Sequence, residues 1–176
     1  TIVGVVDRKD MMSERKTSNG DVLIGLYSSG LHTNGYSLAR KALLEKFDIN
    51  QHIKEINSTV GESLLSVHKS YLKTVMPIMK EDWLTGISHI TGGGIIENTE
   101  RVISSGQELE VDWSSWQVPP IFELIQKVGD VPTEDMRRSF NLGIGMILIV
   151  KRSSVKNVQT YLERIKEPYS VIGEIV

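Results

Sequence analysis

Two histidine-bearing loops hold the residue types best suited to chemistry. Residues 28–37 contain His32 and residues 89–98 contain His89, each among serine, threonine, asparagine or glycine. An imidazole in such a loop can hydrogen-bond a ligand oxygen or transfer a proton near neutral pH. For either histidine alone, a structural hydrogen bond to the loop backbone is the alternative. Both loops follow apolar runs and precede helical patterns. Because ligands of open sheets gather at the carboxyl ends of strands, the two loops together predict a shared cleft.

The second loop also contains three consecutive glycines, Gly92, Gly93 and Gly94. Glycine loses more conformational freedom on folding than any other residue, so this run indicates a sharp turn or a close backbone approach. A helix that starts after the run presents free N–H groups and the positive end of its dipole, which favours an anion such as phosphate. No arginine or lysine occurs between Glu81 and Glu100, so binding would rely on backbone dipoles. A tight turn without a ligand is the alternative, because a glycine run is a weak motif.

Other kinds of site have less support. The four histidines show no metal-ligand spacing with a carboxylate, and we expect His52 in a loop and His68 on a helix face. The chain has no cysteine, which excludes thiolate chemistry. No Lys-Ser/Thr pair follows the glycines, so they are not a Walker A motif. Gly143 and Gly145 lie within an apolar run, where close packing explains them better than a ligand does.

The elements that must position these loops mix without strict strand–helix–strand alternation. Predicted strands cover residues 2–6, 22–27, 85–90, 109–111, 142–150 and 169–176. Predicted helices cover residues 36–47, 63–79, a segment after Gly94, and residues 121–128, 132–138 and 153–167. Residues 48–62 are expected to form a loop. This pattern predicts an α+β fold in which helices pack on the faces of a mixed β-sheet.

Length and charge narrow the range of functions. The 176 residues fit one domain with its own core, and the net charge of −2 gives no electrostatic reason to expect nucleic acid or an anionic membrane as a partner. No apolar run approaches the length of a membrane span. The sequence begins at Thr1 without a methionine, so we expect a piece of a longer protein. Residues 1–20 are expected to be an inter-domain strand and polar lead-in, and residues 21–176 the domain itself.

Three motifs occur in an order that is specific to one family. They are Ser-Ser-Gly-Leu-His-Thr-Asn-Gly-Tyr-Ser-Leu at 28–38, His-Ile-Thr-Gly-Gly-Gly at 89–94 followed by Glu97-Asn98, and Arg-Ser-Phe-Asn-Leu-Gly-Ile-Gly-Met at 138–146. Together they resemble the C-terminal half of the phosphoribosylformylglycinamidine cyclo-ligase (AIR synthetase) family. The resemblance runs from about Thr1 to Val176.

The resemblance implies an α/β/α domain of a cytoplasmic ligase of purine biosynthesis. In that family ATP activates the formyl oxygen of formylglycinamidine ribonucleotide, an amidine nitrogen closes the imidazole ring, and phosphate leaves. It implies that ATP and Mg²⁺ are bound mainly by an N-terminal domain outside this chain, that the enzyme is a homodimer, and that this chain alone is inactive. No metal ligands are expected within the chain.

The resemblance also suggests roles for individual residues. His32 and Asn34 are the candidate catalytic residues, which reach the reacting amidine or the phosphoryl group. His89 holds the loop or touches the ligand. The candidate substrate- and phosphate-binding residues are His89, Thr91, Gly92, Gly93, Gly94 and Gly35.

Two alternatives remain open at the level of sequence. The same superfamily includes selenophosphate synthetase, a hydrogenase-maturation dehydratase, thiamine-monophosphate kinase and the glutamine-dependent formylglycinamidine ribonucleotide synthase. The second alternative is a non-catalytic binding or assembly domain, since the residues present show no metal–ATP motif.

Overall fold

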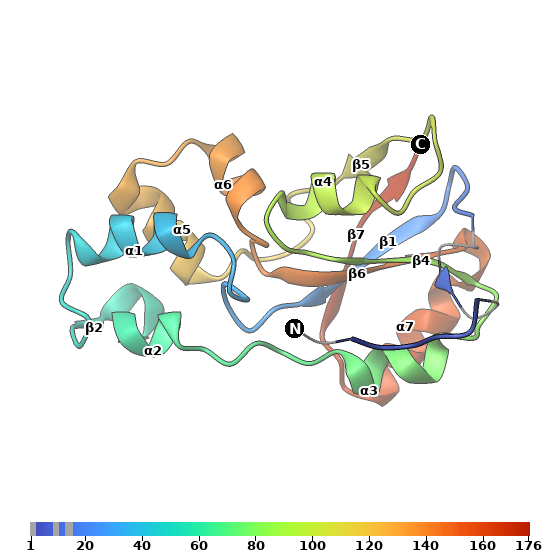
Figure 1. The fold of residues 1–176 in the computed structure, drawn as a ribbon, viewed down its shortest axis with the longest axis horizontal. Helices are drawn as coiled ribbons and strands as arrows, with labels where there is room; N and C mark the ends of the chain where they lie inside the picture. Colours follow the sequence, from blue (N-terminus) through green and yellow to red (C-terminus); the bar gives the residue numbers. More distant parts are fainter. Residues whose placement is uncertain (1–2, 9–10, 13–15) are drawn as a thin grey trace.

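A five-stranded antiparallel sheet forms the centre of the molecule (Figure 1). The computed structural model describes residues 3–8, 11–12 and 16–176. The strand order is β4-β6-β1-β7-β5, and each pairing in this sheet is antiparallel. The strands are β1 (Val22–Tyr27), β4 (Leu84–His89), β5 (Leu109–Val111), β6 (Ile144–Val150) and β7 (Tyr169–Ile175). The predicted α+β class is confirmed, while the sheet differs from the expected mixed pairing in having antiparallel neighbours throughout.

The sheet is covered by helices on both faces, which confirms the layered arrangement. Alternate residues of a strand point to opposite faces, and in β1 Leu23 joins one apolar cluster while Ile24 joins another. The cluster around Ile24 includes side chains of α7 (Val155–Arg164) and of the segment around α3 (Leu72–Val75). The cluster around Leu23 includes Ile95 from α4 (Gly94–Glu100). Figure 1 shows α4 on one side of the sheet, with α3 and α7 on the other.

A third apolar cluster lies beyond one end of the sheet. It joins α1 (Tyr36–Leu44), α2 (Val60–Leu64), α5 (Pro120–Gly129) and α6 (Thr133–Ser139), at the left of Figure 1. Phe122 and Phe140 pack edge to face at its centre, with their ring centroids 5.6 Å apart. The predicted loop at 48–62 contains the short strands β2 (His52–Ile53) and β3 (Ser58–Thr59), with the 3₁₀ turn η3 (Lys54–Ile56) between them. These helices hold the loop that follows β1.

The predicted helix at 63–79 is wrong. Helix α2 ends at Leu64, residues 65–71 are irregular, and α3 is followed by η4 (Met76–Ile78). Tertiary hydrogen bonds replace helical ones in the irregular segment: the Ser29 hydroxyl donates to the carbonyl of Val67 at 2.6 Å, and the N–H of Lys69 donates to His32 Nε2 at 3.4 Å. The helical spacing of apolar residues was therefore misleading. Leu65 and Val67 are more than four-fifths exposed.

The predicted strand at 2–6 is also not found. Residues 3–6 belong to no strand and their valines are exposed, while residue 2 lies outside the described residues. An apolar run forms a strand only where a neighbouring strand supplies hydrogen-bond partners, and no pairing in the described part of the chain involves residues 3–6. Residue Thr17, by contrast, is buried and bonded to Ser104 and Gln107, so the lead-in to β1 is tied to the domain.

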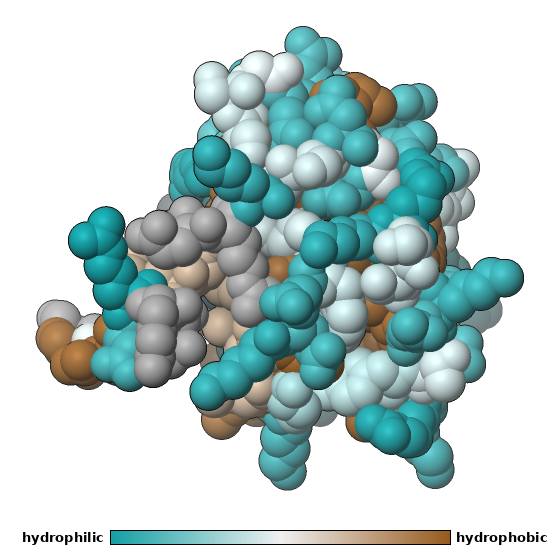
Figure 2. All heavy atoms as spheres, turned by 90° about the vertical axis from the view of Figure 1, so that its right-hand side faces the viewer, coloured by the Kyte–Doolittle hydropathy of each residue, from teal (hydrophilic) through white to brown (hydrophobic). Residues whose placement is uncertain are grey.

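The face at the right of Figure 1 is mostly polar. Figure 2 shows hydrophilic side chains over most of it, with apolar side chains in small separate areas. Across the parts of the chain that the structure describes, no helix is long and apolar enough to cross a membrane.

Candidate functional site

The sheet topology explains why the three sequence motifs meet. Strands β1 and β4 are both antiparallel to β6, which lies between them, so their carboxyl ends lie at the same end of the sheet. Strand β6 begins at that end. The loop with His32 follows β1, the loop with the three glycines follows β4, and the motif with Asn141 precedes β6. The predicted juxtaposition of the His32 and His89 loops is therefore found.

Hydrogen bonds from Asn141 join the first and third motifs. Its side chain donates to the carbonyl of Gly30 at 2.8 Å and accepts from the Ser28 hydroxyl at 3.0 Å. The Ser28 N–H donates to the carbonyl of Gly143 at 2.8 Å. Asn141 is fully buried, so these bonds also satisfy its own polar atoms. The residues just before β6 thus hold the backbone of the His32 loop in place.

His32 is a buried, neutral imidazole. The side chain is 3% exposed, and its Nε2 accepts from the N–H groups of Ser29, at 3.0 Å, and Lys69. The proton of the neutral ring then sits on Nδ1, which has no partner in the described part of the molecule. Burial, together with His68, His89 and Lys69, lowers the pKa of His32 to about 4. These features describe a residue that organises the loop, and they do not favour His32 as a proton carrier at neutral pH.

The pKa of His32 predicts acid sensitivity. Between about pH 6.5 and pH 4 the unfolded chain binds a proton that the folded chain excludes, so stability is full above this window and decreases as the pH falls through it. Urea unfolding at pH 7, 6 and 5 should show this decrease. We expect His32→Gln to reduce its slope, and His52→Gln, at an exposed position, to leave it unchanged. An equal slope in His32→Gln and the unmodified chain would assign the effect to other groups.

His68 was expected on a helix face and instead stacks on His32. The two ring centroids lie 4.0 Å apart with an interplanar angle of 17°, and the ring of His89 lies 5.6 Å from that of His68. His68 and His89 are both exposed. Desolvation and the neighbouring His68 lower the pKa of His89. Three of the four histidines therefore lie together at one end of the sheet. The sequence does not predict the position of His68, because the apolar residues around it have helical spacing.

The N–H groups of the glycine loop already have acceptors. The N–H of Gly93 donates to the carbonyl of Arg138 at 2.8 Å, and that of Gly94 donates to Thr91 at 3.1 Å. The N–H of Gly92 donates to Asn34 Oδ1 at 3.2 Å, which joins the first two motifs. The loop is therefore a self-supported turn. Gly92 is exposed, and its N–H would meet a ligand only if the Asn34 side chain gave up this long bond.

Asn98 organises the glycine loop from inside. It is buried and donates to the carbonyls of Gly94, at 2.7 Å, and Gly92, at 3.2 Å. It also accepts from the Thr91 hydroxyl at 3.0 Å, so that hydroxyl is engaged within the loop. Gly35, a further predicted binding residue, is the N-cap of α1 with φ 69°, and a Cβ there would lie 2.3 Å from the Phe140 ring. Thr91 is therefore engaged within the loop, like the glycine N–H groups, and Gly35 is required by its positive φ and its close approach to Phe140.

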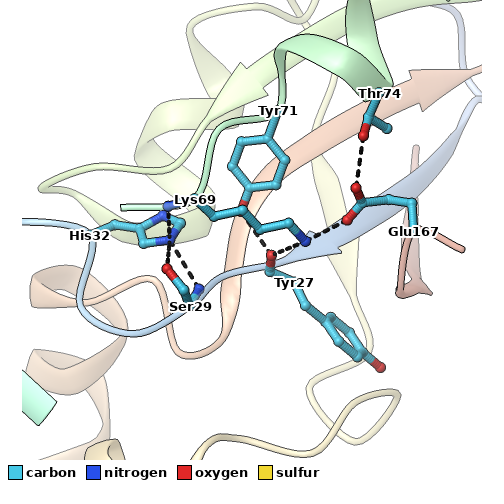
Figure 3. A network of polar contacts seen from close by, with 7 residues as sticks. All are labelled: Tyr27, Ser29, His32, Lys69, Tyr71, Thr74 and Glu167. Atoms are coloured by element: carbon cyan, nitrogen blue, oxygen red, sulfur yellow. Dashed lines mark hydrogen bonds and ion pairs between the residues drawn. The ribbon is translucent and has the colours of Figure 1, made fainter. Parts of the chain in front are cut away.

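A network of polar contacts fixes the segment that carries His68 (Figure 3). Lys69 forms an ion pair with Glu167 and donates to the carbonyl of Tyr27 at 3.0 Å. The Tyr71 hydroxyl donates to the same carbonyl at 2.9 Å, and Thr74 donates to Glu167 Oε2 at 2.7 Å. Desolvation, with a contribution from Glu167, raises the pKa of Tyr71. Residues 65–74 are thereby anchored to the ends of β1 and α7.

The donor groups of this site do not form a metal centre. Among residues 3–8, 11–12 and 16–176, no three histidine, aspartate or glutamate side chains are arranged to hold a metal ion. What the site offers is exposed imidazoles, an amide side chain and a glycine turn. Such groups bind and orient a polar or anionic small molecule.

The fold and the three joined motifs define the C-terminal domain of a known family. A sequence profile described as "AIR synthase related protein, C-terminal domain" matches residues 18–176, and the chain belongs to this family. Solved structures with the same fold include thiamine-monophosphate kinase from Stenotrophomonas maltophilia, with a TM-score of 0.64 and 12% identity over 97% of this chain and 52% of that one. Another is E. coli HypE, a hydrogenase maturation protein, with a TM-score of 0.57 and 17% identity over 92% and 45% of the two chains.

Relatives of higher sequence identity include two cyclo-ligases. Phosphoribosylformylglycinamidine cyclo-ligase from Pseudothermotoga lettingae is 42% identical over 174 residues, which are 99% of this chain and 51% of the relative. The enzyme of that name from Caldanaerobacter subterraneus subsp. tengcongensis is 42% identical over 176 residues, covering 99% and 52%. The chain thus spans about half the length of the relatives it matches.

Proposed function

We propose that this chain is the C-terminal half of an ATP-dependent cyclo-ligase that closes the imidazole ring of formylglycinamidine ribonucleotide to give aminoimidazole ribonucleotide. The similarity to cyclo-ligases over 99% of the chain carries this proposal. The meeting of the three motifs at one end of the sheet supports it, because it provides a polar surface for a small ligand. A cytoplasmic, dimeric parent enzyme belongs to the same proposal.

In this proposal the chain supplies part of the substrate site. Asn34 and Gly92 lie where a ligand oxygen could replace the long bond between them. His89 is exposed beside them and can contact the ligand, while buried His32 holds the loop. We assign the binding of Mg²⁺ and ATP mainly to the other half of the parent protein, in keeping with the family resemblance. When bound there, ATP supplies the phosphoryl group that activates the formyl oxygen.

The proposal predicts a division of activity between the parent protein and this chain. The parent, incubated with ATP, Mg²⁺ and formylglycinamidine ribonucleotide, should form aminoimidazole ribonucleotide and release one phosphate per ring closed. This chain alone should form none, because the proposal assigns the groups that hold Mg²⁺–ATP to the other half of the parent protein. Product can be measured by derivatising the aminoimidazole. A parent that turns over thiamine monophosphate or a selenide, and leaves the ribonucleotide unchanged, would assign the domain to another branch of the superfamily.

A further inference from the structure

The stack of His32, His68 and His89 has a buried end and an exposed end. His32 is buried, and its Nε2 is occupied by N–H donors. His68 lies flat against His32, with 4.0 Å between centroids, and His89 is the next ring, 5.6 Å further along. The outer two rings are exposed. Two imidazoles from distant parts of the chain therefore reach solvent side by side, next to the loop of Gly92.

Hydrogen bonds and an ion pair hold the segment of His68 in its irregular conformation. The flanking residues Leu65 and Val67 are strongly exposed, which is unfavourable for the isolated domain. The segment keeps this conformation because Ser29 bonds the carbonyl of Val67, and because Lys69 is held at both its N–H and its ammonium group. The His32 loop is itself strained, since His32 and Thr33 both adopt positive φ, at 51° and 63°. The hydrogen bonds and the ion pair of this segment thus hold the ring of His68 against the ring of His32.

The contacts around the outer rings leave their N–H groups to acceptor oxygens. Within the described ranges, the hydrogen bonds and ion pairs bring no carboxylate onto His68 or His89. The nearest carboxylate of the network, on Glu167, is engaged by Lys69 and Thr74. The ring of Tyr71 lies edge-on to that of His32, with centroids 6.1 Å apart, and its hydroxyl donates to the carbonyl of Tyr27. The ring N–H groups of His68 and His89 are consequently available to acceptor oxygens of a ligand.

We propose that His68 and His89 form a two-imidazole subsite that binds an oxyanion of a phosphorylated small molecule, with His32 as the buried support that fixes the His68 ring. This inference deepens the proposed function and rests on it for the identity of the ligand. It adds His68 to the site and makes His32 a positioning residue. Stacking on His32 orients the ring of His68, and the contacts of Lys69 hold the adjacent backbone in place.

The test uses inorganic phosphate and the isolated chain, at constant pH and ionic strength. Phosphate should shift the ring NMR signals of His68 and His89 with one shared dissociation constant. His52, exposed on β2 in the separate two-stranded sheet, is the internal control and should not follow that curve. Equal shifts at His52 would overturn the proposal and identify an adventitious ion only. The absence of a saturable shift at His68 would overturn it by showing that there is no site.

Two variants separate hydrogen bonding from stacking. His68→Phe keeps an aromatic ring against His32 but removes the ring N–H, so phosphate affinity should fall about tenfold or more. His52→Phe should leave the affinity unchanged. Unfolding curves establish that both variants are folded, and normal phosphate binding by folded His68→Phe would overturn the proposal. The phosphate readout does not depend on turnover, so a parent enzyme with another substrate would leave it unaffected.

Discussion

Gly94→Ala is expected to lower the free energy of unfolding by about 3 kcal/mol or more. An alanine Cβ at this position would lie 1.7 Å from the Arg137 carbonyl oxygen, and φ there is +66°. The atoms nearest to this Cβ all belong to the backbone of Arg137 and Arg138, so relief requires helices α4 and α6 to separate. Strain of an L-residue in the left-handed region adds to the overlap. Urea or thermal unfolding of the isolated chain measures the loss.

Gly92→Ala is the matched control, two residues away in the same loop. A Cβ at Gly92 would have no atom within 4 Å, and its φ lies outside the positive range. This variant should unfold within about 0.5 kcal/mol of the original chain. Equal losses for the two substitutions would show that the loop responds to any loss of glycine, and the close approach of α4 to Arg137 would then not be the reason for Gly94.

Glu167→Gln is expected to cost about 2 kcal/mol of stability. The carboxylate of Glu167 is only 10% exposed and holds the Lys69 ammonium, which is 24% exposed. Replacing the carboxylate by an amide leaves a largely enclosed cation without a neutralising charge, with only neutral oxygen acceptors such as the carbonyl of Tyr27. The segment of His68 should loosen with it. Hydrogen exchange at the N–H of Lys69, which donates to His32, would report this loosening together with the unfolding curve.

Two further measurements test whether the ion pair itself causes the loss. Glu134→Gln removes an exposed partner of Arg137, an i,i+3 pair with side chains 31% and 73% exposed, and should cost no more than about 0.5 kcal/mol. Combining Glu167→Gln with Lys69→Met should cost less than the sum of the two single changes, because the second removes the unpaired charge. Strict additivity would mean that the two side chains stabilise the domain independently.

Most of the fold was predictable because the local patterns agree with the tertiary structure. The apolar run at 22–27 is β1, buried on both faces, and the start of α5 was given by Pro119-Pro120. The helix at 36–47 ends at Leu44, and the final strand is β7. The failures fall where distant bonds override periodicity. Residues 65–71 have helical spacing, but their hydrogen bonds go to residues 27, 29, 32 and 167.

The location of the site could be predicted from the sequence, but the burial and hydrogen-bond partners of its residues could not. The plan of strand, polar loop and helix placed His32 and His89 at one end of the sheet, as found. Burial cannot be read from residue types, so the sequence does not reveal that His32, a candidate catalytic residue, is enclosed. The free amides expected of Gly92–Gly94 depend on the position of residues such as Asn34 and Arg138, which only the folded chain reveals.

The order of the strands determines when the sheet can form during synthesis. The central strand β1 pairs with β6 and β7, more than a hundred residues later in the chain. At typical translation rates the ribosome needs on the order of ten seconds to produce these partners. Contacts of such high sequence separation also make folding slow. Until then the apolar segment Val22–Tyr27 has neither of its partner strands, and its unpaired backbone groups are a template for pairing with other chains. We therefore expect the domain to be most prone to aggregation before β6 and β7 have been synthesised.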